Sequence, residues 1–173
     1  MARPGRNASS DEILRPDRTF FTTTKAFMGK RLLQSERNAS LLVEVLRSLV
    51  TERAFRLDDF VIMPDHVHLL LTVHGDTTVE KAMQLVKGRF SYRLSHELGY
   101  KGEVWQRGFS EVQVMGRENF ETHRKYIAEN PVKAGLVDSP ENYPFCYAYL
   151  ASLKTKARQG LKPEVPLEHL RHD

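Results

Sequence analysis

The sequence has 173 residues, of which 40% are hydrophobic and 28% are charged. These values are typical of a single globular domain and argue against a disordered chain, a collagen-like repeat or a disulfide scaffold. Its 26 lysines and arginines against 22 acidic residues give a net charge of +4, which favours a polyanionic partner without identifying one. The single cysteine, with no long apolar run and no signal peptide in the sequence, predicts a cytosolic protein without a membrane span.

The first 53 residues contain two regular elements after a polar start. Residues 1–17 are polar and proline-containing, which indicates a flexible N-terminal arm. The run RTFFTTT at residues 18–24 is aromatic and β-branched and predicts a strand. Apolar residues then recur at helical intervals over residues 40–53, which predicts a helix broad enough to cover one face of a sheet.

The middle of the chain has the pattern of a hairpin followed by a second helix. Residues 57–63 and 66–73 are largely apolar and are separated by a Pro-Asp pair, so they predict two antiparallel strands joined by a tight turn. Thr77, with Glu80 three residues later, has the form of a capping box. We therefore expect a helix to begin there and to continue through Leu94.

The last third contains one strand, one helix and a basic segment. Residues 111–115 alternate between polar and apolar side chains, as a half-buried strand does. A helix is predicted from about residue 119 to about residue 130, where Pro131 ends or kinks it. Residues 151–173 are polar and basic and are interpreted as a C-terminal tail.

The order of these elements predicts the fold class. Strand, helix, strand, strand, helix, strand and helix follow the ferredoxin-like split βαβ plan of an α+β protein, with one appended helix. We expect residues 18–150 to form this domain, with an antiparallel sheet and two helices on one of its faces. The opposite face would then be free to carry a functional site.

Two histidines lie two residues apart in the strand predicted at 66–73. Side chains alternate between the faces of a strand, so His66 and His68 point one way while Val67, Leu69 and Leu71 point toward the helices. Two neighbouring neutral imidazoles can share one divalent cation. An isolated His-x-His pair is nevertheless more often two half-exposed histidines without a ligand.

A tyrosine and an asparagine lie one turn apart on the last predicted helix. Tyr126 and Asn130 are at positions i and i+4 and share one face. The amide oxygen of Asn130 could bind a hard metal ion, and Glu129 is a competing oxygen ligand. A tyrosine in the middle of a helix is by itself more often a core or rim residue than a nucleophile.

Four motifs in order resemble those of the HUH single-tyrosine transposases, and in particular the REP-associated tyrosine transposases. The resemblance covers about residues 17–150. Three positions depart from the family pattern. Asp65 stands where Asn is common, and Ala128-Glu129 interrupts the usual stretch before Asn-Pro. The stretch Tyr143–Cys146 stands where Trp-Pro-Trp-Ser is often found. The motifs are FVIMPDHVHLLL at 60–71, KGRF at 87–90, VWQRG at 104–108 and YIAENPVKAGLV at 126–137.

This resemblance implies an endonuclease and strand transferase that acts on single-stranded DNA, often folded into hairpins, and depends on Mg²⁺ or Mn²⁺. It implies that His66 and His68 hold the metal, that Asn130 is a third ligand and that Tyr126 is the nucleophile. Attack by the tyrosine would leave a 5′-phosphotyrosine and a free 3′-hydroxyl, so strands could be rejoined without ATP. The sequence agrees in lacking a P-loop, and we expect no nucleotide cofactor.

Basic and aromatic residues around these motifs are candidates for contact with DNA. Trp105, Phe109 and Tyr100 could stack on unpaired bases, although Trp105 is equally suited to be a core anchor. For any single basic residue, a solvated helix face is an equally good interpretation. The basic candidates are Lys87, Arg89 and Arg93 on the second helix, Arg107 after Trp105, and Arg124, Lys125 and Lys133 around the tyrosine.

Two other functions fit parts of the pattern. A ferredoxin-like module could bind single-stranded nucleic acid without cutting it, although Phe20 and Phe21 are the only strand aromatics comparable to those of RNA-recognition folds. A metal-dependent hydrolase built on His66 and His68 would need further ligands, for which Asp65 alone is weak support. The sequence leaves open whether the protein is a monomer or a homodimer, and a DNA substrate would bring it to the nucleoid.

Overall fold

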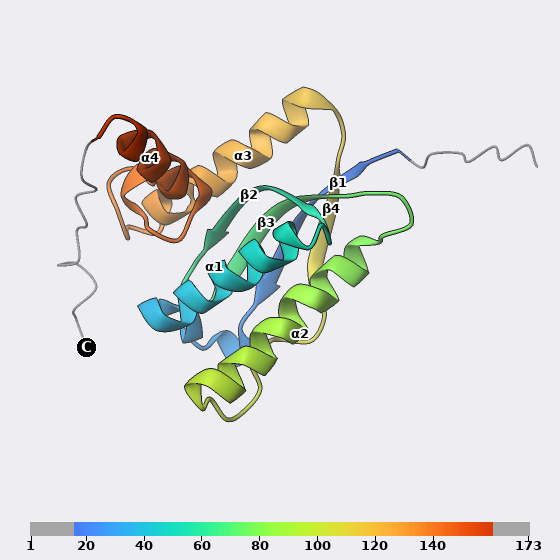
Figure 1. Cartoon of the computed structure of the whole chain (residues 1–173), viewed down its shortest axis with the longest axis vertical. Helices are drawn as coiled ribbons and strands as arrows, with labels where there is room; N and C mark the ends of the chain where they lie inside the picture. Colours follow the sequence, from blue (N-terminus) through green and yellow to red (C-terminus); the bar gives the residue numbers. More distant parts are fainter. Residues whose placement is uncertain (1–15, 161–173) are drawn as a thin grey trace, which may run out of the picture.

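A four-stranded antiparallel sheet is the centre of the computed structural model, which describes residues 16–160 (Figure 1). Residues 1–15, most of the predicted arm, and residues 161–173 of the predicted tail lie outside the described part. The strands lie in the order β2-β3-β1-β4, which is the arrangement of the split βαβ plan. They are β1 (Arg18–Lys25), β2 (Arg56–Ile62), β3 (His66–Val73) and β4 (Ser110–Val114).

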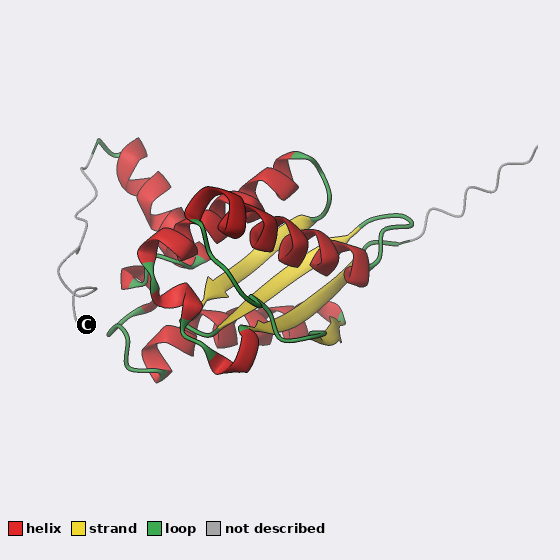
Figure 2. Cartoon of the chain, turned by 90° about the horizontal axis from the view of Figure 1, so that it is seen from below, coloured by secondary structure: helices red, strands yellow, loops and turns green. Residues whose placement is uncertain are grey.

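Two long helices, α1 (Glu36–Thr51) and α2 (Val79–Leu98), lie side by side on one face of this sheet (Figures 1 and 2). The apolar stripe of α1 and the alternate side chains of β3 that face the helices are buried together. Burial of this apolar surface is the main stabilising contribution to the domain. The predicted α+β class and the pair of helices on one face are therefore confirmed.

The start of α2 differs by one residue from the predicted capping box. Thr78, not Thr77, is the N-cap, and its side chain accepts a hydrogen bond from the backbone N–H of Lys81 at 3.1 Å. Thr77 belongs to the preceding turn, where its carbonyl accepts a bond from the Arg18 guanidinium at 2.7 Å. The prediction was wrong because a cap depends on how the chain enters the helix, which adjacent threonines do not specify.

A third helix, α3 (Gly116–Lys133), lies on the opposite face of the sheet and packs on β2 and β3. Ile127 is its buried anchor. The helix is longer than predicted at both ends and passes through Pro131. A proline has no N–H to give to the carbonyl four residues earlier, but the helix continues past it, and the N–H of Ala134 donates to Asn130 at 3.0 Å.

The chain after α3 returns to the edge of the sheet. The backbone N–H of Ile62 donates to Phe145 at 2.9 Å, and the hydroxyl of Tyr143 donates to the carbonyl of Ile62. The helix α4 (Tyr147–Arg158) follows and crosses the predicted domain end at residue 150. The basic residues of this segment made it look like a polar tail, but the helix also carries apolar residues, and Leu150 packs against the core. Three short 3₁₀ turns complete the described chain: η1 (Phe27–Gly29), η2 (Leu32–Gln34) and η3 (Pro140–Asn142).

None of the helices between residues 16 and 160 combines the length and the apolar character that a bilayer crossing requires.

Candidate active site on the sheet face beside helix α3

The two histidines of β3 lie together on the face of the sheet that α1 and α2 leave uncovered. Their ring centroids are 4.8 Å apart, in an edge-to-face arrangement. Val67 between them points to the core and is buried. The alternation of side chains along the strand therefore places both imidazoles as the sequence predicts.

Each imidazole has a polar partner at its Nδ1 atom. Nδ1 of His66 lies 2.7 Å from a carboxylate oxygen of Asp65, and Nδ1 of His68 lies 2.8 Å from the hydroxyl of Thr23 on β1. When Nδ1 carries the proton and donates it to these oxygens, Nε2 of each ring has its lone pair available. Such partners orient the imidazoles of metal sites and raise their basicity.

His68 is held in its neutral form. Burial, and secondarily the neighbouring His66, lowers the pKa of His68 to about 4. Only 5% of the residue is exposed. At neutral pH its ring can therefore bind a cation without first having to lose a proton.

The ring of Tyr126 lies directly beside this pair. Its centroid is 5.4 Å from that of His68 and 5.7 Å from that of Phe21, and both arrangements are edge-to-face. Phe21 also stacks on His68 at 5.2 Å. Tyr126 is 45% exposed, so its phenol is neither in the interior nor away from the imidazoles.

A further histidine, His123, joins this cluster from α3. Its ring is 4.8 Å from that of Phe21, and its Nδ1 donates to the carbonyl of Asn119 at 2.8 Å. Sequence reasoning missed His123 and Thr23, and it considered Phe21 only as a strand aromatic comparable to those of RNA-recognition folds. His123 precedes Tyr126 by three residues, so helical spacing was a usable signal, whereas Thr23 and Phe21 become visible only through the pairing of β1 with β3.

Asn130 follows Tyr126 by one turn of α3 and is half-buried. Its competitor Glu129 is already engaged, because its carboxylate lies 3.8 Å from the Lys125 ammonium and 3.2 Å from the Lys133 ammonium. Within residues 16–160, no cluster of three or more His, Cys, Asp or Glu side chains could hold a metal ion. Among the described residues, a third ligand for the histidine pair would have to be of another type, such as the Asn130 amide.

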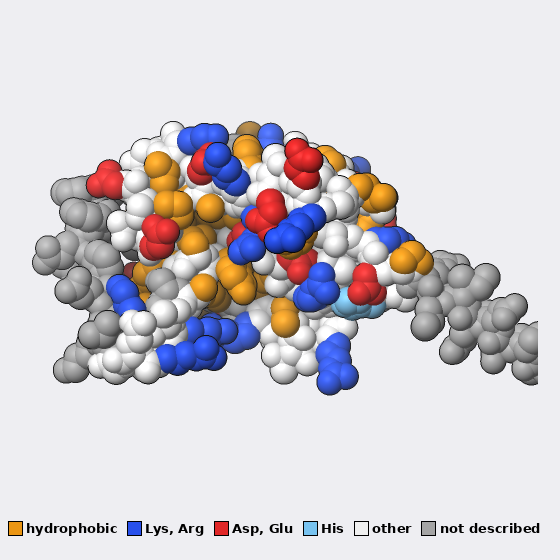
Figure 3. Space-filling model, turned by 90° about the horizontal axis from the view of Figure 1, so that it is seen from above, with side chains coloured by type: hydrophobic (Ala, Val, Ile, Leu, Met, Phe, Trp, Pro, Cys, Tyr) orange, Lys and Arg blue, Asp and Glu red, His pale blue; other side chains and the backbone are white. Residues whose placement is uncertain are grey.

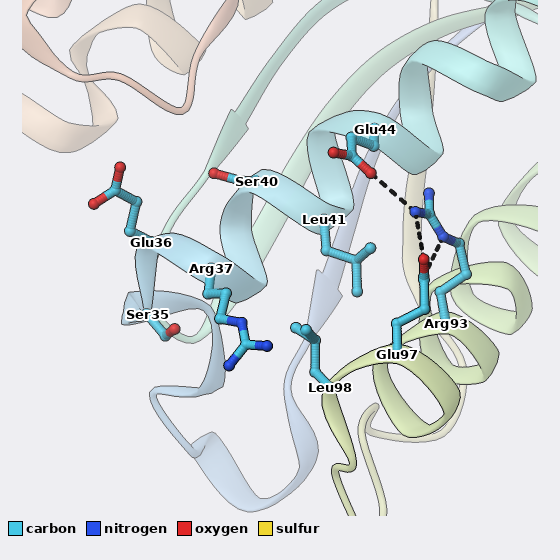
Figure 4. A pocket seen from close by; sticks show the side chains of 9 residues that line it. All are labelled: Ser35, Glu36, Arg37, Ser40, Leu41, Glu44, Arg93, Glu97 and Leu98. Carbon is cyan, nitrogen blue, oxygen red and sulfur yellow. Dashed lines mark hydrogen bonds and ion pairs between the residues drawn. The ribbon is translucent and has the colours of Figure 1, made fainter.

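The predicted DNA contacts on α2 lie on the helix side of the sheet and already have protein partners. Arg89 pairs with Glu52 of α1 at 2.7 Å, and Arg93 pairs with Glu44 of α1 at 2.9 Å. Figure 4 shows Arg93 reaching both Glu44 and Glu97, at an open groove of about 690 Å³ between the two helices. These guanidiniums join α1 to α2, and the structure does not bring them to the histidines.

Lys87 holds the loop that follows α2. Its ammonium donates to the carbonyls of Gln106 at 3.1 Å and Gly108 at 2.7 Å, and burial lowers its pKa. The indole N–H of Trp105 donates to the backbone of Lys87 at 3.1 Å, and its ring lies 5.4 Å from Phe90. Trp105 is therefore a core anchor and not an exposed surface for stacking bases.

The predicted cations near Tyr126 are also largely engaged. Arg124 lies 3.4 Å from Asp59 of β2, which links α3 to the sheet. Burial outweighs this guanidinium and raises the pKa of Asp59 to about 6. Lys125 and Lys133 bracket Glu129, and Arg107 is exposed. Figure 3 shows basic side chains interspersed with acidic ones on the face it presents.

Comparisons with known proteins agree with one another. Residues 28–130, more than half of the chain, match the family described as "Transposase IS200 like". The chain is similar to the REP-associated tyrosine transposase of Escherichia coli (strain K12), with 28% identity over 127 residues, which are 73% of each chain. A solved structure of a REP-associated tyrosine transposase bound to a REP hairpin matches with a TM-score of 0.65 and 24% identity, over 94% of this chain and 89% of that one.

Proposed function

The chain belongs to the IS200-like family of HUH tyrosine transposases, and from this premise we propose how it acts. It is a single-stranded DNA endonuclease and strand transferase that uses Tyr126 as its nucleophile. The observation that carries this proposal is the exposed phenol of Tyr126 with its ring 5.4 Å from that of His68. A phenol buried in the core could not reach a DNA strand.

The histidine pair suits a divalent cation, Mg²⁺ or Mn²⁺. The fit is supported by two adjacent imidazoles whose Nδ1 atoms have oxygen partners and whose Nε2 atoms can face a ligand. His66, His68 and the Asn130 amide would hold the ion, and Asn130 is preferred because two lysines neutralise Glu129. When bound, the cation polarises the scissile phosphate and offsets the charge that develops on it.

The residues of the chain set up an exchange of phosphodiester bonds. A phenol is a weak nucleophile, so Tyr126 must be positioned against its target, and the rings of Phe21 and His68 restrict its orientation. The phenol oxygen bonds to phosphorus as the bond from phosphorus to the 3′-oxygen breaks. The phenol proton is released, and the 3′-oxygen leaves as a hydroxyl after taking up a proton. The 5′-phosphotyrosine conserves the bond energy, and a 3′-hydroxyl can reverse the step.

We propose that the substrate is single-stranded DNA with hairpins. The relative of known structure is described as bound to a REP hairpin, and a basic chain with net charge +4 suits a polyanion. Such a substrate places the action of the protein at the nucleoid. Both a monomer and a homodimer are compatible with a tyrosine that lies beside the histidines of its own chain.

The test uses a pool of DNA hairpins with randomised stems and single-stranded arms, because the recognised sequence is unknown. The full chain is incubated with this pool and Mn²⁺ and then denatured. We expect a protein–DNA adduct that retains a label at the 3′ end and releases a label at the 5′ end. Tyr126→Phe should abolish the adduct. Tyr92→Phe is the matched control, since Tyr92 is also exposed and stacks on His96, at 3.9 Å, but lies on α2.

The same experiment separates the other two functions. Cleavage that persists in Tyr126→Phe, without an adduct in the wild type, would indicate a metal-dependent hydrolase. Binding of the pool without any product over a range of Mn²⁺ concentrations would indicate an inert binding module. Either result overturns the proposed chemistry.

A further inference from the structure

Lys25 is the last residue of β1 and lies beside the histidine pair. It is the cross-strand partner of His66 on β3. Directly opposite residues in an antiparallel pair project on the same face of the sheet, with Cβ atoms about 5 Å apart. The Lys25 side chain therefore begins next to the imidazole of His66, on the face that carries Tyr126.

The backbone at Lys25 is fixed on both sides. Its carbonyl accepts a hydrogen bond from the N–H of Gln106 at 2.9 Å, and the N–H of the next residue, Ala26, donates to Asp65 at 2.8 Å. Asp65 is also the residue that contacts Nδ1 of His66. The position of Lys25 is thus coupled to the segment that orients the histidine.

The ammonium of Lys25 differs from the other cations near this face. Its side chain is exposed, and within residues 16–160 it forms no ion pair. Arg124, Lys125 and Lys133 each have a carboxylate nearby. A cation that already pairs with a carboxylate must exchange that partner to bind a phosphate, whereas Lys25 does not.

A second exposed cation follows in the segment hydrogen-bonded to Lys25, and within residues 16–160 it forms no ion pair. Arg107 is exposed and directly follows Gln106, whose N–H is bonded to the carbonyl of Lys25. This hydrogen bond joins, at the end of β1, two segments that are far apart in the sequence. From the histidine pair, the backbone of Lys25 and then that of Arg107 lie in one direction, toward the loop before β4.

From this arrangement we infer that Lys25 binds the DNA phosphate that neighbours the scissile one, with Arg107 next along the same single strand. The inference rests on the proposed function and adds to it the direction in which the strand leaves the site. A lysine is a compact charge with three rotatable donors, so it binds phosphate without reading the base. Lys25 should therefore contribute affinity and register but no sequence preference.

The test compares Lys25→Gln with Lys81→Gln, a control that removes an exposed lysine from α2 on the other side of the sheet. Binding is measured at several salt concentrations for hairpins with single-stranded arms and for hairpins without them. For armed hairpins, Lys25→Gln should weaken binding and reduce the slope of log affinity against log salt by about 0.7 to 1. Lys25→Arg, which keeps the charge, should restore most of the affinity.

Two results would overturn the inference. One is an equal effect of Lys25→Gln and Lys81→Gln on armed hairpins, and the other is an equal effect of Lys25→Gln on hairpins with and without arms. The readout is binding, so it does not depend on cleavage. If Lys25→Gln weakens binding but the wild type forms no tyrosine adduct, the phosphate contact stands and only the proposed chemistry is overturned. If the wild type binds neither kind of hairpin, both the contact and the chemistry are overturned.

Discussion

The two faces of the sheet use the same strands for different purposes. On the face covered by α1 and α2, Val67, Leu69 and Leu71 of β3 are buried in a continuous apolar core. On the other face, His66 and His68 of the same strand lie among aromatic rings and polar partners. The alternation along one strand thus separates the residues that stabilise the domain from those that form the candidate site.

The cations of the two faces differ in the same way. Arg89 and Arg93 cross between the helices to carboxylates of α1. Lys25, opposite His66, and Arg107 are exposed and form no ion pair within residues 16–160. Arg124, Lys125 and Lys133 lie on the site side as well, but each has a carboxylate nearby. The comparison therefore teaches that the carboxylates within reach of a basic residue, and not the number of basic residues on its helix, decide whether it is available for a phosphate.

The largest effect on stability should come from a comparison in which one phenylalanine on each face of the sheet is replaced by alanine. Phe90 of α2 is fully buried, so Phe90→Ala should cost about 3 to 5 kcal/mol of unfolding free energy. Phe21→Ala, on the site face, should cost less stability but disturb the adduct with DNA, because Phe21 contacts His68 and Tyr126. Denaturant unfolding and adduct formation measure the two effects, and a stability loss from Phe21→Ala as large as that from Phe90→Ala would contradict the division of the faces.

A smaller effect is expected from the hydroxyl that contacts His68. Thr23→Val keeps the shape of the side chain and removes the oxygen 2.8 Å from Nδ1, so Mn²⁺ affinity should fall about 10- to 100-fold. Thr19→Val is the control, since Thr19 lies on the same strand and face but bonds to Thr72 at 2.8 Å. Calorimetric titration with Mn²⁺ measures the difference, and equal affinities for the two variants would exclude an orienting role for Thr23.

The next largest effect should be the influence of Asp59 on how the unfolding free energy depends on pH. Its pKa of about 6, raised by burial from 3.8, means that the folded state binds its proton more readily than the unfolded state. The wild type should therefore lose about 1 to 2 kcal/mol relative to Asp59→Asn as the pH rises from 4 to 7. The measurement is unfolding of metal-free protein across this range.

The comparison with Asp59→Asn is needed because the contribution of His68 to stability changes with pH in the opposite direction. The lowered pKa of His68, about 4, contributes stability that is present above pH 6.5 and is lost as the pH falls toward 4. Both proteins carry this histidine, so its contribution cancels in their difference. A difference independent of pH would mean that Asp59 titrates in the folded protein as it does in an unfolded chain.

The smallest effect should be that of Arg89→Gln. Because Arg89 pairs with Glu52 on the helix side, its loss should leave the salt dependence of DNA binding unchanged. A phosphate contact would instead reduce the slope by about 1. A slope reduced as much as by Lys25→Gln would show that DNA also lies along the helices and would break the comparison between the faces.

Local sequence patterns predicted the elements and the faces on which their side chains lie. The alternation in β3 placed the two imidazoles on one face, and the apolar stripes of α1 and α2 predicted the covered side. The predicted boundaries were wrong at Thr78, at Pro131 and at α4, because caps, terminal helical turns and a short amphipathic helix depend on neighbouring segments.

The sequence by itself determined that an imidazole pair lies on a strand and that Tyr126 and Asn130 share a helix face, because strand and helix periods are local properties of the chain. Only the tertiary structure decided that α3 docks across the sheet and brings Tyr126 to His68, 58 positions earlier in the chain. It also decided that the Thr23 hydroxyl contacts His68, that Arg89 and Arg93 are engaged between helices, and that Lys25 forms no ion pair among residues 16–160. Those outcomes depend on which surfaces pack together and which charges meet there, and no local period encodes them.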